Sequence, residues 1–288
     1  MQIGMIGLGR MGGNMAARLR DRGHAVVGYA RHRPPSDVDT LDELVASVEA
    51  PRVVWSMVPA GDATDQAIAG LGTLLDPGDL VVDGGNSNYR DSQRRAEALA
   101  HKQIRFVDAG VSGGVWGLEN GYCLMVGGEV SDVERLQPVF DALAPAGGFV
   151  HAGPVGAGHF TKMVHNGIEY GLMQSYAEGY ELLRASELDI DVHGAFDAWR
   201  QGSVVRSWLL DLLAAELEDD ADLTDLKGFA EDSGEGRWTV QEAVRLGVPA
   251  PAISAALYAR FASRQDDSPA MKVIAALRKA FGGHPTKQ

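Results

Sequence analysis

The sequence has little cysteine, a shortage of cations and no long apolar run. Cys123 is the only cysteine among 288 residues, so no intrachain disulfide can form, and a reducing cytoplasm is the expected setting. Lys and Arg total 26 against 39 Asp and Glu, and the net charge of −13 argues against a general surface for nucleic acid or anionic membranes. No stretch approaches the roughly 20 apolar residues of a membrane span. The apolar start MQIGMIGLG has no basic segment before it, so we expect a first strand rather than a signal peptide.

What is present is ordinary globular composition, with 45% apolar and 23% charged residues. The first half alternates strand-like with helix-like runs, which is typical of βαβ units and a mostly parallel sheet. The expected strands are 2–8, 24–30, 52–58, 79–85, 105–111 and 123–128, and the helices between them include 14–23, 40–49 and 87–102. After a glycine-rich hinge at 153–159, helices are expected at 160–186, 193–201, 204–218, 238–246, 250–264 and 268–281. We therefore predict two domains, residues 1–158 and residues 159–288.

Residues 7–12, GLGRMG, follow an apolar strand and open a helix, which is the context that makes a GxGxxG sequence informative. Gly7 permits the tight turn, Gly9 lets backbone N–H groups approach a pyrophosphate, and Gly12 allows close helix–strand packing. A merely structural glycine turn is the alternative. The predicted fold class is an α/β N-terminal Rossmann-type dinucleotide-binding domain, followed by an all-α C-terminal domain for substrate binding and oligomerisation. The cofactor site is also expected to include Leu8, Met11 and Val58.

The end of the second expected strand bears on the choice of cofactor. NAD-binding proteins commonly place an acidic residue there to hold the ribose 2′-hydroxyl. This chain has Ala30 at that point, followed by Arg31, His32 and Arg33. A guanidinium can bind a 2′-phosphate in a bidentate way, so we predict a preference for NADP, with NAD as a second cofactor. The alternative is that these arginines are solvent-exposed loop cations.

Residues 158–171, GHFTKMVHNGIEYG, combine helical character with two interior glycines, Gly167 and Gly171. Each glycine costs a helix about 1 kcal/mol relative to alanine. Four polar side chains lie at spacings that place them on one face of the helix, where an amphipathic helix normally carries its apolar stripe: Lys162, His165, Asn166 and Glu169. A surface salt-bridge face is the simplest structural explanation, but a His-Asn-Gly run suits such a surface poorly.

This segment, with residues 7–15, 82–95, 106–128, 233–239, 258–261 and 278–284, resembles the decarboxylating 6-phosphogluconate dehydrogenases of the β-hydroxyacid dehydrogenase superfamily. At 288 residues the chain is similar to their short-chain form. The glycine fingerprint, an SGG loop and the lysine are shared across the superfamily. KMVHNGIEY is narrower, because relatives of the hydroxyisobutyrate type usually have Lys-x-x-Asn-Asn at that place.

The resemblance implies oxidation of 6-phosphogluconate by NADP+ and loss of CO2 to give ribulose 5-phosphate, as in the pentose phosphate pathway. Lys162 matches the base that takes the proton of the 3-hydroxyl, since a desolvated lysine near a cationic ring can act as a base. Glu169 matches the acid that protonates C1 of the enediol. Asn166 and His165 would orient the hydroxyls, and the two glycines would let the cofactor or a neighbouring backbone approach. No metal is expected.

The resemblance also implies the substrate contacts. Ser112, Gly113 and Gly114 would bind the carboxylate end, and Asn86 would lie between nicotinamide and substrate. Tyr170 and Arg260 match phosphate contacts, although Arg260 could be an ordinary surface residue. Arg278 and His284 match a tail pair that reaches the neighbouring subunit's site, which implies a homodimer or homotetramer with a shared active site; a disordered basic tail is the alternative.

Two departures from the long-chain pattern bear on these assignments. Ser233 and Glu235 stand where the long-chain enzymes have Lys and Thr on the phosphate, and Glu235 would repel a phosphate unless it points away. Pro59 replaces a lysine that contacts the cofactor. Two other functions therefore stay open: a related dehydrogenase acting on gluconate or another unphosphorylated hydroxyacid, and a non-catalytic NADP-binding sensor.

Overall fold

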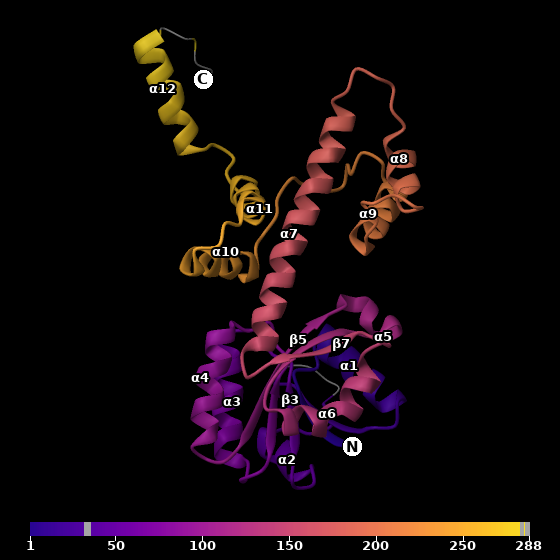
Figure 1. The fold of residues 1–288 in the computed structure, drawn as a ribbon, viewed down its shortest axis with the longest axis vertical. Coiled ribbons are helices and arrows are strands. Elements are labelled where there is room, and N and C mark those ends of the chain that lie inside the picture. Colours follow the sequence, from indigo (N-terminus) through magenta and orange to yellow (C-terminus); the bar gives the residue numbers. More distant parts are fainter. Residues whose placement is uncertain (32–35, 283–284, 286–288) are drawn as a thin grey trace. The chain divides into compact units, whose positions relative to one another are not determined.

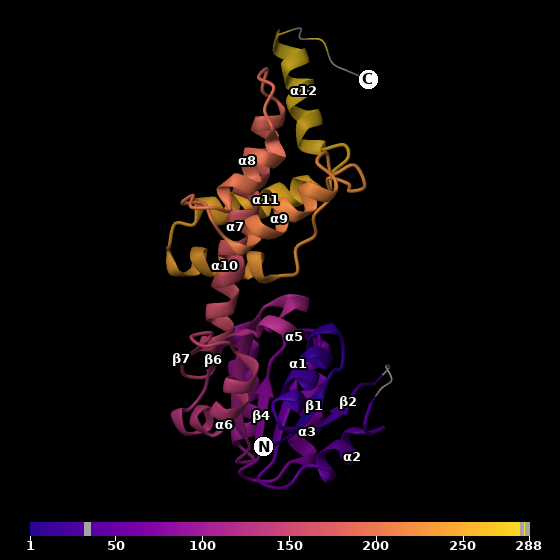
Figure 2. The same ribbon diagram turned by 90° about the vertical axis from the view of Figure 1, so that its right-hand side faces the viewer.

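The computed structural model describes residues 1–31, 36–282 and 285. The chain forms two compact units, Met1–Val164 and His165–Gln288. The first contains a seven-stranded sheet with helices on its faces, and the second is helical in its described part (Figures 1 and 2). The predicted fold class is confirmed. Helix α7, Ala157–Arg184, belongs to both units.

The sheet of the first unit has the strand order β2-β1-β3-β4-β5-β6-β7. All neighbouring strands are parallel except β5 and β6. The carboxyl ends of β1, β3, β4 and β5 therefore lie at one edge of the sheet. The strand order reverses between β1 and β3, and ligands of such sheets bind in the crevice at this point. The strands are β1 Gln2–Ile6, β2 Ala25–Tyr29, β3 Val53–Ser56, β4 Leu80–Asp83, β5 Arg105–Ser112, β6 Cys123–Gly127 and β7 Phe149–Gly153.

Helices cover both faces of the sheet (Figure 1). Along β3, Val53 and Trp55 pack into a core with helices α1 and α6, whereas Val54 packs into a core with α2, α3 and α4. Burial on both faces explains why the strands are nearly continuous apolar runs in the sequence. The helices are α1 Arg10–Asp21, α2 Leu41–Ala46, α3 Asp62–Leu74, α4 Tyr89–Ala100, the short η1 Gly114–Trp116 and α5 Gly117–Asn120, and α6 Val130–Leu143.

Two elements of the first unit differ most from the sequence prediction. Strand β7 was not expected, because FVHAG is a short, half-exposed edge strand set among glycines and proline. Helix α1 starts at Arg10 rather than at residue 14, so Gly12 and Gly13 lie inside the helix. Its first N–H groups are thus presented directly after β1, where an anionic ligand would meet them.

In the second unit, two small cores surround α7. One core joins α7 to α8 and α9 around Phe196 and Leu210, and the other joins it to α10 and α11 around Tyr170 and Leu257. The six C-terminal helices expected from the sequence are all present. They are α7, α8 Val192–Trp199, α9 Trp208–Asp219, α10 Glu235–Leu246, α11 Pro251–Ala262 and α12 Pro269–Gly282. Within the described ranges, no helix combines the length and the apolar character that crossing a bilayer requires.

Candidate active site

The glycine-rich turn after β1 has the geometry of a dinucleotide-binding loop. Gly7 has a φ of +89°, and a Cβ there would lie 2.6 Å from the carbonyl oxygen of Met57. A Cβ on Gly12 would overlap the carbonyl oxygen of Gly7, so helix α1 packs on the turn only because this residue is glycine. A Cβ on Gly9, the N-cap of α1, would meet no heavy atom within 4 Å. Protein packing explains Gly7 and Gly12 but not Gly9, and this pattern fits an anionic group held at the helix N-terminus.

The loops after β3 and β4 converge on the same turn. A Cβ on Gly7 would lie 3.2 Å from Cγ1 of Val58, and one on Gly85 would lie 2.8 Å from the Val58 carbonyl oxygen. Asn86 is exposed between the buried residues Gly85 and Ser87. Sequence-expected residues from three different loops thus gather at one edge of the sheet. Leu8 and Met11 are half-buried in the turn and in the first turn of α1.

A buried ion-pair network supports the loop that carries Asn86. Asp83, at the end of β4, accepts hydrogen bonds from the Ser87 hydroxyl at 2.9 Å and from Arg95 at 3.1 Å. Arg95 is itself buried and also pairs with Asp65 at 2.8 Å. These side chains were not predicted, because nothing in the sequence brings residues 65, 83 and 95 together.

The end of β2 carries both a cation and a carboxylate. Arg31 follows Ala30 and is exposed, while His32 and Arg33 lie outside the described residues. Asp37 was not expected at this site; it accepts hydrogen bonds from the Gly28 N–H at 2.7 Å and from Arg20 at 2.5 Å. The Asp37 charge is therefore compensated by a guanidinium along the outer edge of β2.

Strand β5 and the start of α7 lie in close contact. A Cβ on Gly110 would overlap the Cβ of Lys162, and one on Gly158 would lie 2.6 Å from the carbonyl oxygens of Asp108 and Met125. Lys162 is 7% exposed and is therefore a buried residue. Ser112 ends the strand at the same edge as the dinucleotide loop. The structure therefore brings Lys162 to the strand that leads into the serine–glycine–glycine turn.

The turn after Ser112 is held in place by helix α1. Gly113 and Gly114 have φ angles of +138° and +54°, which favour glycine. Arg18 of α1 is buried, and its guanidinium donates to carbonyl oxygens at the C-terminal ends of two helices, where the helix dipoles favour a cation. These acceptors are Leu118 and Glu119 at 2.9 and 3.2 Å, and Ala142 and Leu143 at 3.0 and 3.1 Å.

A buried cluster of Asp108, His159 and Ser92 lies beneath the start of α7. Asp108 accepts hydrogen bonds from the N–H groups of Gly156 and His159, and the His159 Nδ1 lies 2.7 Å from the Ser92 hydroxyl. Burial raises the pKa of the Asp108 carboxyl, while the His159 ring and the two N–H groups act in the opposite direction. These three residues were not expected from the sequence.

The remaining residues of the polar helix face belong to the second unit. His165 Nδ1 lies 2.9 Å from Asn166 Oδ1 and 3.9 Å from a carboxylate oxygen of Glu169. The side chains of His165 and Glu169 are each 38% exposed. Helix α7 runs without interruption from Ala157 to Arg184, so the spacing that placed Lys162 and these residues on one face is realised.

The two helix glycines have different surroundings. A Cβ on Gly167 would lie 2.7 Å from Cγ2 of Thr239 in α10, whereas one on Gly171 would meet no heavy atom within 4 Å. The neighbour at Gly167 is thus a side chain rather than the cofactor or backbone expected from the sequence. Gly167 allows α10 to pack against α7.

We expect alanine at these two positions to change stability in opposite directions. Gly171→Ala gains up to about 1 kcal/mol from helix propensity. Gly167→Ala loses about 1–3 kcal/mol through overpacking against Thr239. Urea unfolding of both variants measures the difference. If both variants shift the free energy of unfolding in the same direction, contact with Thr239 is not the reason for a glycine at position 167.

Tyr170 and Arg260, the expected phosphate contacts, lie together in the second unit. The Arg260 guanidinium carbon is 3.5 Å from the centroid of the Tyr170 ring, and the Ser233 N–H donates to the Tyr170 hydroxyl at 3.4 Å. Glu235 is 2% exposed, and one of its oxygens accepts a hydrogen bond from the Ser233 hydroxyl at 2.7 Å. This corner of the second unit, formed by Tyr170, Ser233, Glu235 and Arg260, therefore contains a cation stacked on an aromatic ring and a buried carboxylate.

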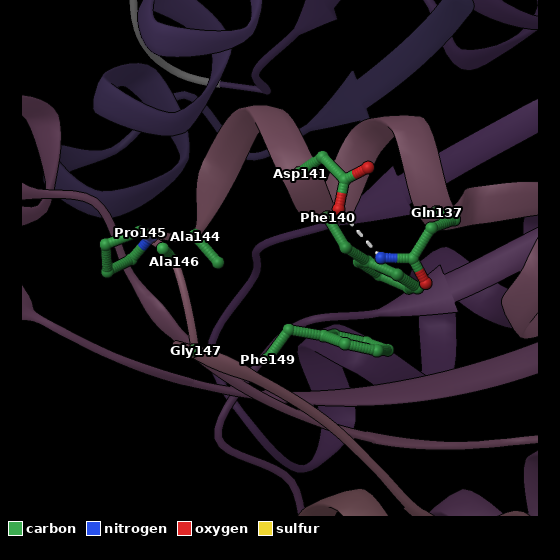
Figure 3. Close-up of a pocket in the computed structure, with 8 residues that line it drawn as sticks. All are labelled: Gln137, Phe140, Asp141, Ala144, Pro145, Ala146, Gly147 and Phe149. Carbon is green, nitrogen blue, oxygen red and sulfur yellow. Dashed lines mark hydrogen bonds between the residues drawn. The ribbon is translucent and has the colours of Figure 1, made fainter.

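The other expected positions and features lie elsewhere. Arg278 is exposed on α12, and His284 lies outside the described residues. A pocket of about 420 Å³ between α6 and β7 is lined by residues of segment 137–149, including the stacked rings of Phe140 and Phe149, and by none of the expected site residues (Figure 3). Among the described residues there is no group of three or more His, Cys, Asp or Glu side chains suited to a metal ion.

Comparison with known proteins shows the family of the chain. The model of the NAD-binding domain of 6-phosphogluconate dehydrogenase matches residues 2–153, and the model of the 6-phosphogluconate dehydrogenase C-terminal domain matches residues 158–285. The Bacillus subtilis protein YqeC, provisionally named a 6-phosphogluconate dehydrogenase, is 41% identical over 100% of both chains. A Haloferax volcanii protein named as an NAD(+)-dependent, decarboxylating 6-phosphogluconate dehydrogenase is 43% identical over 99% of this chain and 98% of its own.

A solved structure supports the same relationship. The 6-phosphogluconate dehydrogenase of Plasmodium falciparum, solved with NADP+ and with 6-phosphogluconate, is 28% identical with a TM-score of 0.80. The match covers 100% of this chain and 67% of the other. Over nearly its whole length, the chain belongs to the 6-phosphogluconate dehydrogenase family.

Proposed function

We propose that the protein oxidises 6-phosphogluconate at its 3-hydroxyl and decarboxylates the product to ribulose 5-phosphate and CO2, with a nicotinamide dinucleotide as hydride acceptor. One observation carries this proposal: buried Lys162 lies against Gly110 of β5, on the strand that ends at Ser112, at the same edge of the sheet as the dinucleotide loop. A buried amine next to the expected substrate turn is better suited to transferring a substrate proton than to interacting with solvent. Membership of the family supports the substrate.

In this reaction the chain's own residues bind the substrate and move protons. A dinucleotide whose pyrophosphate is held at the glycine-rich turn would supply the hydride-accepting chemistry through its nicotinamide. Lys162 takes the proton of the 3-hydroxyl and, as an ammonium, polarises the resulting 3-ketone, so that the β-keto acid loses CO2 readily. Glu169, two turns along α7, donates the proton to C1 of the enediol. His165 and Asn166 orient the substrate hydroxyls, and Ser112 with its two following glycines binds the carboxylate end.

The direct test is formation of reduced cofactor and release of CO2 from 6-phosphogluconate. We expect both products in equal amounts. Gluconate is the second candidate substrate, because buried Glu235 lies in the corner that contains Tyr170 and Arg260. A kcat/KM for gluconate that equals or exceeds that for 6-phosphogluconate would favour the second candidate. Binding of NADP without turnover of either acid would point to a sensor.

For the cofactor we propose NADP, with NAD as the second acceptor. Exposed Arg31 at the end of β2 and compensation of Asp37 by Arg20 support a site that accepts a 2′-phosphate. The known relatives differ, since the Haloferax volcanii protein is named as NAD(+)-dependent and the Plasmodium falciparum structure holds NADP+.

Arg31→Ala tests the cofactor proposal. We expect the variant to raise the KM for NADP+ at least about tenfold and to leave the KM for NAD+ within about twofold, because a lost charge-assisted pair with the phosphate is worth about 1.5–3 kcal/mol. Arg22→Ala is the matched control. Arg22 is an exposed arginine at the C-terminal end of α1, whereas the cofactor is expected at the N-terminal end of this helix. Equal changes for both cofactors in Arg31→Ala would contradict a role in reading the 2′-phosphate.

We also propose that the protein works as a homodimer or homotetramer in a reducing compartment such as the cytoplasm, with Arg278 and His284 completing a neighbouring subunit's site. Four apolar side chains of α12, Met271, Val273, Ile274 and Leu277, are 48–59% exposed, which suits coverage by a second copy. The exposed thiol of the single cysteine, Cys123, supports the reducing setting. The molar mass in solution, measured by sedimentation equilibrium, tests the assembly, and a monomer that turns over normally would contradict it.

A further inference from the structure

Helix α7 begins without a capping side chain of its own. The first N–H groups of a helix lack partners inside it, and Ser, Thr, Asp or Asn at the N-cap usually supplies one. The residues just before α7 and at its start are GPVGAG (153–158), and none of their side chains can accept a hydrogen bond. Asp108 of β5 takes this role from a distant part of the chain. Its two oxygens accept from the N–H groups of Gly156 and His159, at 2.6 and 2.7 Å.

The two hydrogen bonds of Asp108 depend on close packing around its carboxylate. Asp108 is fully buried, and its cross-strand neighbour is Gly127. A Cβ on Gly127 would lie 2.5 Å from an Asp108 oxygen and 2.7 Å from the Gly158 nitrogen, so a larger residue would separate the carboxylate from the helix. On the other side, the buried His159 ring contacts the Ser92 hydroxyl at 2.7 Å and ties α7 to α4.

Asp108 shares one face of β5 with two residues of the site. Positions i, i+2 and i+4 of a strand point to the same side, and here they are Asp108, Gly110 and Ser112. Gly110 is the residue against which Lys162 lies, and Ser112 opens the expected substrate turn. One strand therefore contains the cap of α7, the contact surface of the lysine and the first substrate contact.

We propose that Asp108 is a positioning residue, which holds the first turn of α7 against β5 and so fixes where the Lys162 amine stands relative to Ser112. The inference rests on the proposed function, because it assigns Lys162 the proton transfer. A helix whose first turn loosens would shift Lys162, and a misplacement of about 1 Å in a catalytic group can cost on the order of 100-fold in rate.

Asp108→Asn is the informative variant, because it preserves size while turning one acceptor into an amide donor that faces an N–H group. We expect kcat to fall about 30–100-fold, with the KM for 6-phosphogluconate and for the cofactor within about threefold. We also expect a larger deuterium isotope effect on kcat with substrate deuterated at C3, because hydride transfer becomes slower. An unchanged kcat would overturn the proposal.

Asp79→Asn is the matched control. Asp79 is 1% exposed and also accepts two backbone N–H groups, from Arg52 at 2.5 Å and Asp76 at 2.9 Å, but it precedes β4 at the other edge of the sheet. We expect it to lower the urea midpoint as Asp108→Asn does and to leave kcat within about twofold. Equal losses of kcat in both variants would show that Asp108 contributes general stability only.

Hydrogen exchange separates failure of this inference from failure of the proposed function, and a second variant covers the case in which Asp108→Asn does not fold. If the wild type does not turn over 6-phosphogluconate, the proposed function fails, and hydrogen exchange of residues 156–164 still tests the cap: faster exchange in Asp108→Asn than in Asp79→Asn supports it, and equal exchange overturns it. If Asp108→Asn does not fold, Ser92→Ala decides, since it removes only the hydroxyl beside His159. A kcat about 3–10-fold lower supports the positioning role, and wild-type kcat in Ser92→Ala overturns it.

Discussion

Lys162→Met abolishes hydride transfer from 6-phosphogluconate and leaves cofactor binding unchanged, if Lys162 is the proton acceptor. General acid–base groups contribute about 10²–10⁴-fold to rate, and this lysine would act both on the hydroxyl proton and on the ketone. We therefore expect kcat to fall at least about 10³-fold. Methionine has a similar length and is apolar, so we expect it to fit at position 162, where the lysine is 7% exposed. Stopped-flow measurement of reduced cofactor and a cofactor titration give the two quantities.

Lys102→Met is the control for loss of a lysine in the same unit. Lys102 donates to the Gly72 carbonyl oxygen at 2.5 Å, away from the carboxyl edge of the sheet. We expect its kcat to stay within about twofold of the wild type, because surface changes rarely reach a site. A Lys162→Met enzyme that keeps more than a tenth of the wild-type kcat would exclude Lys162 as the base.

The second large effect concerns the glycines of the dinucleotide loop. Gly12→Ala places a methyl group into the Gly7 carbonyl oxygen and 2.9 Å from Cβ of Met57, and backbone atoms cannot yield easily. We expect it to lower the free energy of unfolding by 3 kcal/mol or more, at or above the usual range of about 1–3 kcal/mol for overpacking. Cofactor binding would be lost with it. Urea unfolding and fluorescence titration with reduced cofactor measure both effects.

Gly9→Ala separates ligand approach from protein packing. A Cβ there meets no protein atom within 4 Å, so we expect an unchanged urea midpoint. The methyl group would nevertheless stand where a pyrophosphate approaches the first N–H groups of α1, and we expect cofactor affinity to fall at least about tenfold. Wild-type affinity in Gly9→Ala would place the pyrophosphate away from this turn.

Local patterns in the sequence predicted most of the fold. The apolar runs of β1, β3, β4 and β5 are buried on both faces, so they stand out in the sequence as strands, and the motif at residues 7–12 indicated the dinucleotide loop. Strand β7 escaped because an edge strand needs no continuous apolar run. The start of α1 was placed four residues late, because its interior glycines disfavour helix and are retained for close packing.

The supporting residues of the site could not be predicted in the same way. Asp108 and His159 are 51 residues apart, and the acceptors of Arg18 are 100 or more residues away. Only the folded sheet brings such pairs together. One sequence signal did exist: Asp108 interrupts an apolar strand, and a long helix follows a segment without any capping side chain. For Glu235, the sequence indicated that its charge would repel a phosphate, but it did not indicate that the side chain is buried against Ser233.

The uninterrupted course of α7 restricts insertions and deletions more strongly than it restricts substitutions. Each residue added to an α-helix turns everything beyond it by about 100° and advances it by about 1.5 Å. A single-residue insertion between Lys162 and Glu169 would leave both side chains intact and point them in different directions around the axis. Exposed Ile168 can vary in this stretch, whereas the number of residues in it cannot.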